Sequence, residues 1–167
     1  MKLCSFFLPL GLYVVASSAF NCTTSALDSI LPSHASALFA TPVQANGTFG
    51  QAGDIGYPKH ATNLPPLCAV SVNVTSSATT SFTFGLFLPY NWNGRFLTVG
   101  NGAFTGGINW LDMGAGVQYG FAVISTNTGH NGTGANSTFA LNSSDAKLDW
   151  LYRALHSSII VAKQVVQ

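Results

Sequence analysis

Two loops hold the residues of this sequence that suit chemistry, and each loop directly follows a short apolar run. The first loop, Gly100–Gly107, comes after Phe96–Val99, and the second loop, which contains His130, comes after Phe121–Ile124. Glycines let a backbone approach a bound molecule closely, and an imidazole can act as a general base. The two loops are therefore the candidate functional segments of the chain.

His130 has two interpretations. A general base needs a nucleophile and an orienting carboxylate, and the run Ser125–Asn127 is not a nucleophile turn. The other interpretation is that His130 hydrogen-bonds loop backbone at the floor of a pocket. The remaining histidines, His34, His60 and His156, have no metal-ligand spacing, so we expect them in core or surface positions and expect no metal site.

The two apolar runs predict buried parallel strands, because such strands are continuous apolar runs and ligands bind at their carboxyl ends. Upstream, apolar residues alternate with polar ones in 70–75 and 81–88, which predicts two half-exposed strands forming an antiparallel edge. The many prolines and glycines between Phe20 and Leu67 predict an irregular segment with a short helix near Ser25–Ile30. The expected fold class is α/β.

The last segment, Asp145–Gln167, has the strongest helical pattern. Asp145 suits the first turn, and Asp149 can pair with Arg153 one turn later. We expect the helix to pack on the sheet through one apolar stripe. The stripe comprises Leu148, Leu151, Tyr152, Leu155, Ile159, Ala162 and Val166.

The N-terminus resembles a secretory signal. A basic tip, an apolar segment over Leu3–Ala16 and the small residues Ser17–Ala19 predict a removed signal peptide over residues 1–19, with a retained anchor helix as the alternative. Removal of the signal takes Cys4 away. In an oxidising compartment the two remaining cysteines, Cys22 and Cys68, are expected to form one disulfide.

The composition fits a secreted glycoprotein. Charged residues make up only 7% of the chain, and without the signal five basic side chains balance five acidic ones, so no nucleic-acid partner and no acidic membrane surface is expected. Six Asn-x-Ser/Thr sites would let glycans solubilise this surface. They are Asn21, Asn46, Asn73, Asn131, Asn136 and Asn142.

Four motifs in order resemble the tannase and feruloyl esterase family of secreted serine esterases. They are Asn93–Leu97, Gly100–Ile108, Tyr119–Gly132 and Trp150–His156. The resemblance implies an α/β-hydrolase domain with an inserted, calcium-binding lid domain. It also implies a Ser-Asp-His triad that acts on aromatic acid esters of plant polymers. The family-like pattern has Asp where this chain has Asn127.

The resemblance also implies site residues. One backbone N–H of the oxyanion hole in α/β-hydrolases comes from the loop after the third strand, which makes Gly102, Ala103 and Phe104 the candidates. The alternative is that the loop glycines only make a tight connection. The family's Cys-Ser-x-Gly-Gly nucleophile motif does not occur in the sequence. We therefore expect residues 20–167 to be the N-terminal portion of the catalytic domain, without lid, triad or cofactor and inactive alone.

Two functions remain open at the level of sequence. The first is a carboxylic ester hydrolase of which this chain supplies the oxyanion loop and a pocket wall. The second is a non-catalytic secreted glycoprotein or carbohydrate-binding fragment that uses the exposed aromatic residues Tyr90, Trp92 and Trp110. A downstream reading frame that encodes the nucleophile motif would favour the first.

Overall fold

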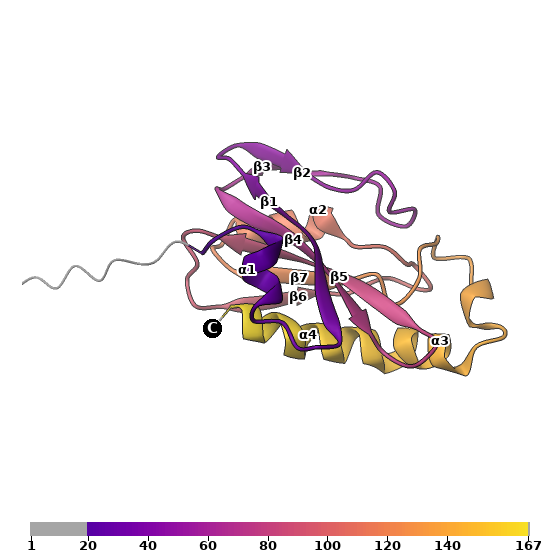
Figure 1. Ribbon diagram of the computed structural model, residues 1–167. Coiled ribbons are helices and arrows are strands. Elements are labelled where there is room, and N and C mark those ends of the chain that lie inside the picture. The colour runs from indigo at the N-terminus through magenta and orange to yellow at the C-terminus, as the bar shows by residue number, and fades with distance from the viewer. Residues whose placement is uncertain (1–19, 167) are drawn as a thin grey trace, which may run out of the picture.

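The computed structural model describes residues 20–166, so the predicted signal peptide and Cys4 lie outside the described residues. A five-stranded sheet forms the centre of the fold, with segments packed on both of its faces (Figure 1). In spatial order its strands are β1 (Ala35–Val43), β4 (Leu67–Thr75), β5 (Ser81–Pro89), β7 (Ala122–Thr126) and β6 (Phe96–Val99). The expected α/β class is confirmed.

The two apolar runs do form parallel neighbours. β6 pairs parallel with β7, and β7 pairs antiparallel with β5, so the sheet is mixed. Every residue of β7 is buried, whereas all four residues of β6 are only half-buried. The prediction of two fully buried strands is therefore wrong for β6, because β6 is the last strand on its side of the sheet.

β4 and β5 are both inner, mostly buried strands, contrary to the prediction of two half-exposed strands at an antiparallel edge, although they do pair antiparallel. Strand β4 shows the reason. β1 pairs with it along one side and β5 along the other. Its first six residues are all buried, because Val70 and Val72 face one core while Leu67 and Ala69 face the other. The alternating pattern marked the strand correctly, but small residues at the second face concealed its burial.

The proline-rich segment is more regular than predicted. The expected short helix is present as α1 (Thr24–Asp28), where the Thr23 side chain accepts from the Ala26 N–H at the N-cap. After α1 the prediction of irregular structure is largely wrong, since β1 covers nine residues and β2 (Gly47–Phe49) pairs with β3 (Ala61–Leu64). Long-range pairing with β4 stabilises β1, and local composition does not report such pairing.

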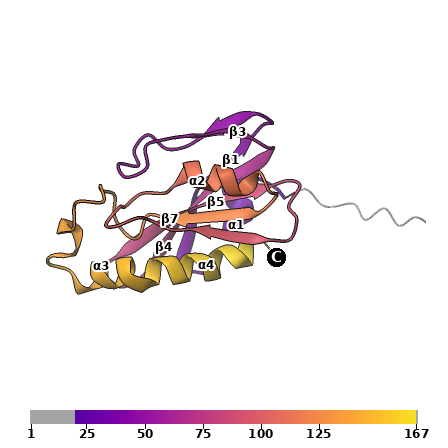
Figure 2. The same ribbon diagram turned by 180° about the vertical axis from the view of Figure 1, so that it is seen from behind.

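A separate core lies on each face of the sheet. One face packs against α1 and the C-terminal helix, with Leu27 and Val161 among its buried residues. The other face packs against α2 (Trp110–Val117) and the β2–β3 hairpin, which Figures 1 and 2 show on the opposite side from the C-terminal helix. Asn109 is the N-cap residue of α2, and its side chain accepts from the Asp112 N–H.

The predicted disulfide is present. Cys22, just before α1, is bonded to Cys68 in β4. Cys68 is fully buried and belongs to the core beneath α1. The bond closes a loop of 46 residues, which the entropy of loop closure makes worth about 4 kcal/mol.

The C-terminal segment is helical, and the second half of its predicted apolar stripe packs on the sheet as expected: Ala162 is buried, and Ile159 and Val166 pack against the same core. The prediction is wrong for the first half, Leu148–Leu155, whose stripe residues are exposed. The segment comprises α3 (Ser144–Leu148), a π-helical turn η2 (Asp149–Arg153) and α4 (Ala154–Val165), which run along one face of the sheet (Figure 2). The residues that are buried are Asp149, Ala154, Ser158, Val161, Ala162 and Val165. The large residues that are exposed are Leu148, Leu151, Tyr152, Leu155 and Ile160.

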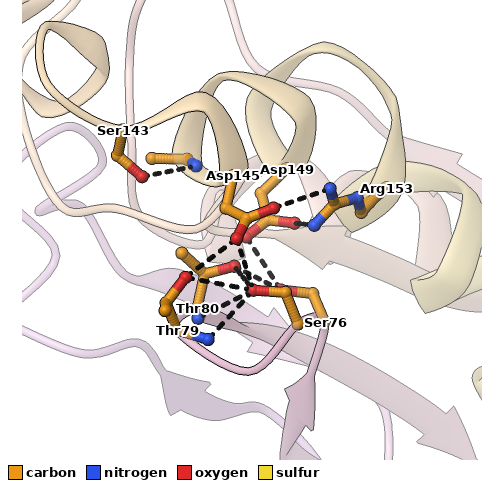
Figure 3. A network of polar contacts seen from close by, with 9 residues as sticks. Ser76, Thr79, Thr80, Ser143, Asp145, Asp149 and Arg153 are labelled. Carbon is orange, nitrogen blue, oxygen red and sulfur yellow. Dashed lines mark hydrogen bonds and ion pairs between the residues drawn. The ribbon is translucent and has the colours of Figure 1, made fainter.

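The π-helical turn explains why the first half of the predicted stripe is exposed. An extra residue in a helical turn rotates the preceding residues relative to the following ones, so a stripe drawn at constant period is misplaced. The buried carboxylate of Asp149 accepts a hydrogen bond from Ser76 Oγ at 2.8 Å and lies 3.6 Å from Arg153 Nη1 (Figure 3). Asp145 accepts from Thr79 and pairs with Arg153 at 2.9 Å. The β4–β5 turn thereby fixes the start of the helix.

Candidate functional site

The candidate site is a cavity of about 270 Å³ at the carboxyl ends of β6 and β7. Both loops singled out in the sequence contribute to it, and the π-helical turn and α4 form its apolar wall. Its lining residues are Gly100, Asn101, Ala103, Thr126, Thr128, Trp150, Leu151 and Leu155. Trp150 packs on Phe104 with 5.2 Å between ring centroids, which continues the aromatic surface beyond the cavity.

Two of the lining residues have strained backbones. Ala103 has φ 51° and Thr128 has φ 56°, a region in which a side chain with a Cβ is disfavoured. The Thr105 N–H donates to the Gly102 carbonyl at 3.1 Å, so Ala103 occupies the first central position of a tight turn. Strained residues of this kind occur often at functional sites.

Among the three oxyanion candidates, two N–H groups are already used. Gly102 N donates to the Tyr57 hydroxyl at 2.9 Å, and Phe104 N donates to the Gly134 carbonyl at 3.3 Å. Within residues 20–166, no acceptor is found for the N–H of Ala103. Ala103 is therefore the candidate whose donor is available to a bound molecule.

Asn101 shapes the same loop. Its side-chain Nδ2 donates to the carbonyls of Thr105 and Gly107, at 3.1 and 3.0 Å. Its Oδ1 is buried and has no partner within residues 20–166. A buried acceptor without a donor costs free energy, which the two bonds from Nδ2 offset in part.

His130 connects the two loops and does not line the cavity. Its Nε2 lies 2.8 Å from the Phe104 carbonyl, which can only accept, so Nε2 carries a proton. Its ring stacks on Phe139 at 3.6 Å between centroids. The carbonyl of His130 also accepts from the Gly107 N–H at 3.1 Å. The predicted hydrogen bond from His130 to loop backbone is therefore present, but its predicted place at the floor of the pocket is wrong. Its other nitrogen, Nδ1, lies 3.3 Å from Thr128 Oγ1, so neither nitrogen is without a partner.

Two neighbouring polar residues also have structural partners. Ser125 is fully buried, and its Oγ accepts from the Asn109 N–H at 3.1 Å. Asn127 Oδ1 accepts from the N–H groups of Thr83 and Gly129, both at 2.9 Å. A neutral amide oxygen is sufficient for these two bonds, so the Asn at this position preserves the loop geometry that a carboxylate would give.

The sequence analysis did not identify the segment that contacts the Gly100–Gly107 loop through Tyr57. We call residues 51–57, between β2 and β3, the strap. Besides the Tyr57 contact, Asp54 accepts from Trp110 Nε1 at 2.9 Å, and burial raises the pKa of the Asp54 carboxyl although hydrogen bonds from Ile108 N and Trp110 oppose the shift. No local pattern marked these residues, because their partners are about 45 to 56 positions away.

The predicted binding aromatics and glycosylation sites lie outside the cavity. Trp110 is fully buried, so the prediction that it is an exposed binding aromatic is wrong, and only Tyr90 and Trp92 of that set are exposed. Of the six predicted glycosylation sites, only Asn73 is half-buried, in β4, and the others are exposed. Across residues 20–166, three potential metal-ligating side chains nowhere gather, and none of the helices is long and apolar enough to cross a bilayer.

The comparisons with known proteins give one consistent result. The family described as tannase and feruloyl esterase matches residues 68–167. "Probable feruloyl esterase B-2" of Aspergillus flavus is 44% identical over 101 residues, which are 60% of this chain and 19% of that protein. "Feruloyl esterase C" of Talaromyces stipitatus is 36% identical over 104 residues. The chain thus matches about a fifth of the length of these curated relatives.

Solved structures agree. The crystal structure of feruloyl esterase B from Aspergillus oryzae superposes with a TM-score of 0.76 at 32% identity and covers 86% of this chain and 28% of that one. Tannin acyl hydrolase from Aspergillus niger superposes with a TM-score of 0.60 at 18% identity over 86% of this chain and 28% of that one, which supports the fold alone.

Proposed function

Because this chain belongs to the tannase and feruloyl esterase family, we propose that it supplies the oxyanion loop and one pocket wall of a secreted carboxylic ester hydrolase that acts on aromatic acid esters. The observation that carries this proposal is the unused N–H of the strained residue Ala103, which borders a cavity at the carboxyl ends of two parallel strands. A preorganised backbone donor of this kind stabilises the oxyanion that forms during acyl transfer.

The cavity wall suits an aromatic acid. Trp150, Leu151 and Leu155 present the apolar surface on which an aromatic ring can pack. The names of the relatives support feruloyl esters as substrates. Secretion is supported by the signal-like residues 1–19 and by the Cys22–Cys68 disulfide, which suits an oxidising compartment.

We also propose that residues 20–167 alone do not hydrolyse esters. The sequence contains no Cys-Ser-x-Gly-Gly motif, and Ser125 is buried and hydrogen-bonded. An oxyanion donor acts only after a nucleophile has attacked, and loss of triad members costs factors of about 10⁴ to 10⁶ in turnover. The nucleophile, base and second donor would come from residues beyond this sequence.

Two measurements test the function. The purified 20–167 chain should not hydrolyse methyl ferulate or methyl gallate. A chimera in which residues 20–167 replace the corresponding segment of feruloyl esterase B from Aspergillus oryzae should hydrolyse methyl ferulate, because this chain supplies the oxyanion loop in its place.

Two results would contradict the proposal. One is turnover by the short chain that a covalent serine-directed inhibitor blocks, which would mean that a nucleophile lies within it. The other is a folded chimera without turnover, which would mean that the loop around Ala103 does not provide a competent donor.

A further inference from the structure

Asn131 lies in the loop after β7, and both the nitrogen and the oxygen of its side-chain amide hydrogen-bond to the backbone of the strap. Its Nδ2 donates to the Gly53 carbonyl at 2.6 Å, and its Oδ1 accepts from the Ile55 N–H at 2.8 Å. Such a paired contact fixes the orientation of the amide and joins segments 76 or more positions apart.

The strap packs tightly against its neighbours at Gly56. A Cβ on Gly56 would overlap the Gly106 carbonyl oxygen and the Thr105 side chain, and would lie 2.7 Å from the Gly132 carbonyl oxygen. Gly132 follows Asn131 directly, and its carbonyl accepts from the Gly106 N–H at 2.9 Å. The strap, the loop of the proposed oxyanion donor and the loop of Asn131 therefore form one contiguous layer.

Asn131 is also the first residue of an Asn-Gly-Thr glycosylation site, and its side chain is exposed. An N-glycan replaces one of the two hydrogens on Nδ2, the atom that lies 2.6 Å from the Gly53 carbonyl. Loss of the donating hydrogen would break one of the two hydrogen bonds by which the Asn131 amide contacts the strap.

Three other exposed sites, Asn46, Asn136 and Asn142, make different contacts. Asn46 lies in the turn before β2, and Asn142 precedes the N-cap residue of α3; neither side chain makes a hydrogen bond within residues 20–166. Asn136 uses only its Oδ1, which accepts from Thr138, and Nδ2 stays free of partners in the same range. These three can carry a sugar without losing a contact.

We propose that Asn131 is a structural clamp that folds without a glycan, and that Asn46, Asn136 and Asn142 are glycan acceptors. The inference rests on the proposed secretion, which supplies the glycosylating compartment. It replaces the sequence-based expectation of a glycan on Asn131. Failure of esterase activity would leave it unaffected, because its tests measure sugar occupancy and strap stability.

Site mapping is the first test. The full chain is secreted from a yeast host, and peptide-N-glycosidase F is applied in isotope-labelled water, which marks each formerly glycosylated Asn as a labelled Asp. We expect label at Asn46, Asn136 and Asn142 and an unlabelled Asn131. Labelled Asn131 in most of the folded, secreted material would overturn the proposal, and so would a secreted chain without label at the other three sites.

Matched variants separate the clamp from the glycan. Thr133→Ala removes the glycosylation site and keeps the Asn131 amide, so we expect no glycan-sized loss of mass and unchanged trypsin cleavage after Lys59, just beyond the strap. Asn131→Ala removes the amide and should accelerate that cleavage at least several-fold. Thr48→Ala, which removes the Asn46 site, should lower the mass by one glycan. A glycan-sized mass loss in Thr133→Ala, or wild-type cleavage in Asn131→Ala, would contradict the clamp.

Discussion

Single residues carry unusual conformations and environments where the two loops meet. Ala103 and Thr128 have positive φ on opposite sides of one cavity, and their strain is maintained by the hydrogen bonds of the surrounding loops. A few hydrogen bonds at about 1 kcal/mol each are comparable with the cost of such backbones, at about 1–3 kcal/mol each. The site geometry thus depends on contacts from the strap and from His130.

The Asp54 carboxyl provides a prediction at this scale. Burial raises its pKa in the folded chain above the unfolded value of about 3.9, so the folded state binds the proton more tightly. Asp54 therefore favours folding most below about pH 4 and loses that contribution as the pH rises through its folded pKa. Asp54→Asn should remove this decline. Urea unfolding followed by tryptophan fluorescence, over acidic to neutral pH, measures it.

Asp145 is the matched control, because its shift has the opposite sign. Hydrogen bonds from Arg153, Thr79 and Ser77 hold the pKa of the Asp145 carboxyl below its ordinary value. Its contribution is present above about pH 4 and is lost as the pH falls through the lower folded pKa. Asp145→Asn should therefore flatten the acid limb of the stability profile. Equal slopes for both variants would contradict these assignments.

At the level of elements, the π-helical turn η2 determines how the C-terminal helix meets the site. It turns Asp149 into the core beneath the β4–β5 turn and leaves Trp150 and Leu151 at the cavity. A continuous α-helix over the same residues would change the relative orientation of Asp149 and the α4 face. The Ser76–Asp149 hydrogen bond and the Arg153 pairs stabilise this register (Figure 3).

Asp149→Ala should be strongly destabilising. It removes the buried carboxylate that accepts from Ser76 Oγ and lies 3.6 Å from Arg153, and the loss of a hydrogen bond to a charged group costs about 1.5–3 kcal/mol. Asp145→Ala, on the outer side of the same network, should cost clearly less. Chemical denaturation of both variants gives the order, and a smaller loss for Asp149→Ala would show that the network does not stabilise the helix start.

At the scale of the whole molecule, several exposed apolar side chains lie together on the C-terminal helical segment. Leu151 and Tyr152 are 65% and 57% exposed, and Leu148 and Leu155 are also exposed on the same helical segment. β6 pairs on one side only, which adds free backbone groups at the edge of the sheet. A continuous apolar helix face and a free parallel edge together favour association.

We therefore expect the purified chain to self-associate. Leu151→Lys combined with Leu155→Lys should shift the material toward monomer in analytical ultracentrifugation, because both changes place charge on the apolar face. Tyr119→Lys is the control, since Tyr119 is 74% exposed but lies after α2, away from this helix. A wild-type chain that is monomeric and melts cooperatively would contradict the expectation.

The sequence alone determined the features that depend on local pattern and on single residue types. The continuous apolar run of β7, the alternation of β4 and β5, the short helix α1 and the parallel pairing of β6 with β7 were predicted correctly. The disulfide followed because Cys22 and Cys68 are the only cysteines after the predicted signal.

Only the tertiary structure decided what depends on distant partners. β1 forms because β4 lies beside it, and the helix stripe is displaced because Ser76 and Arg153 hold Asp149 inside. Among three equivalent candidates, Ala103 was left as the free donor because Tyr57 and Gly134 satisfy the others. The physical reason is that hydrogen-bond satisfaction is set by the whole fold, whereas periodicity and composition record only what neighbouring residues share.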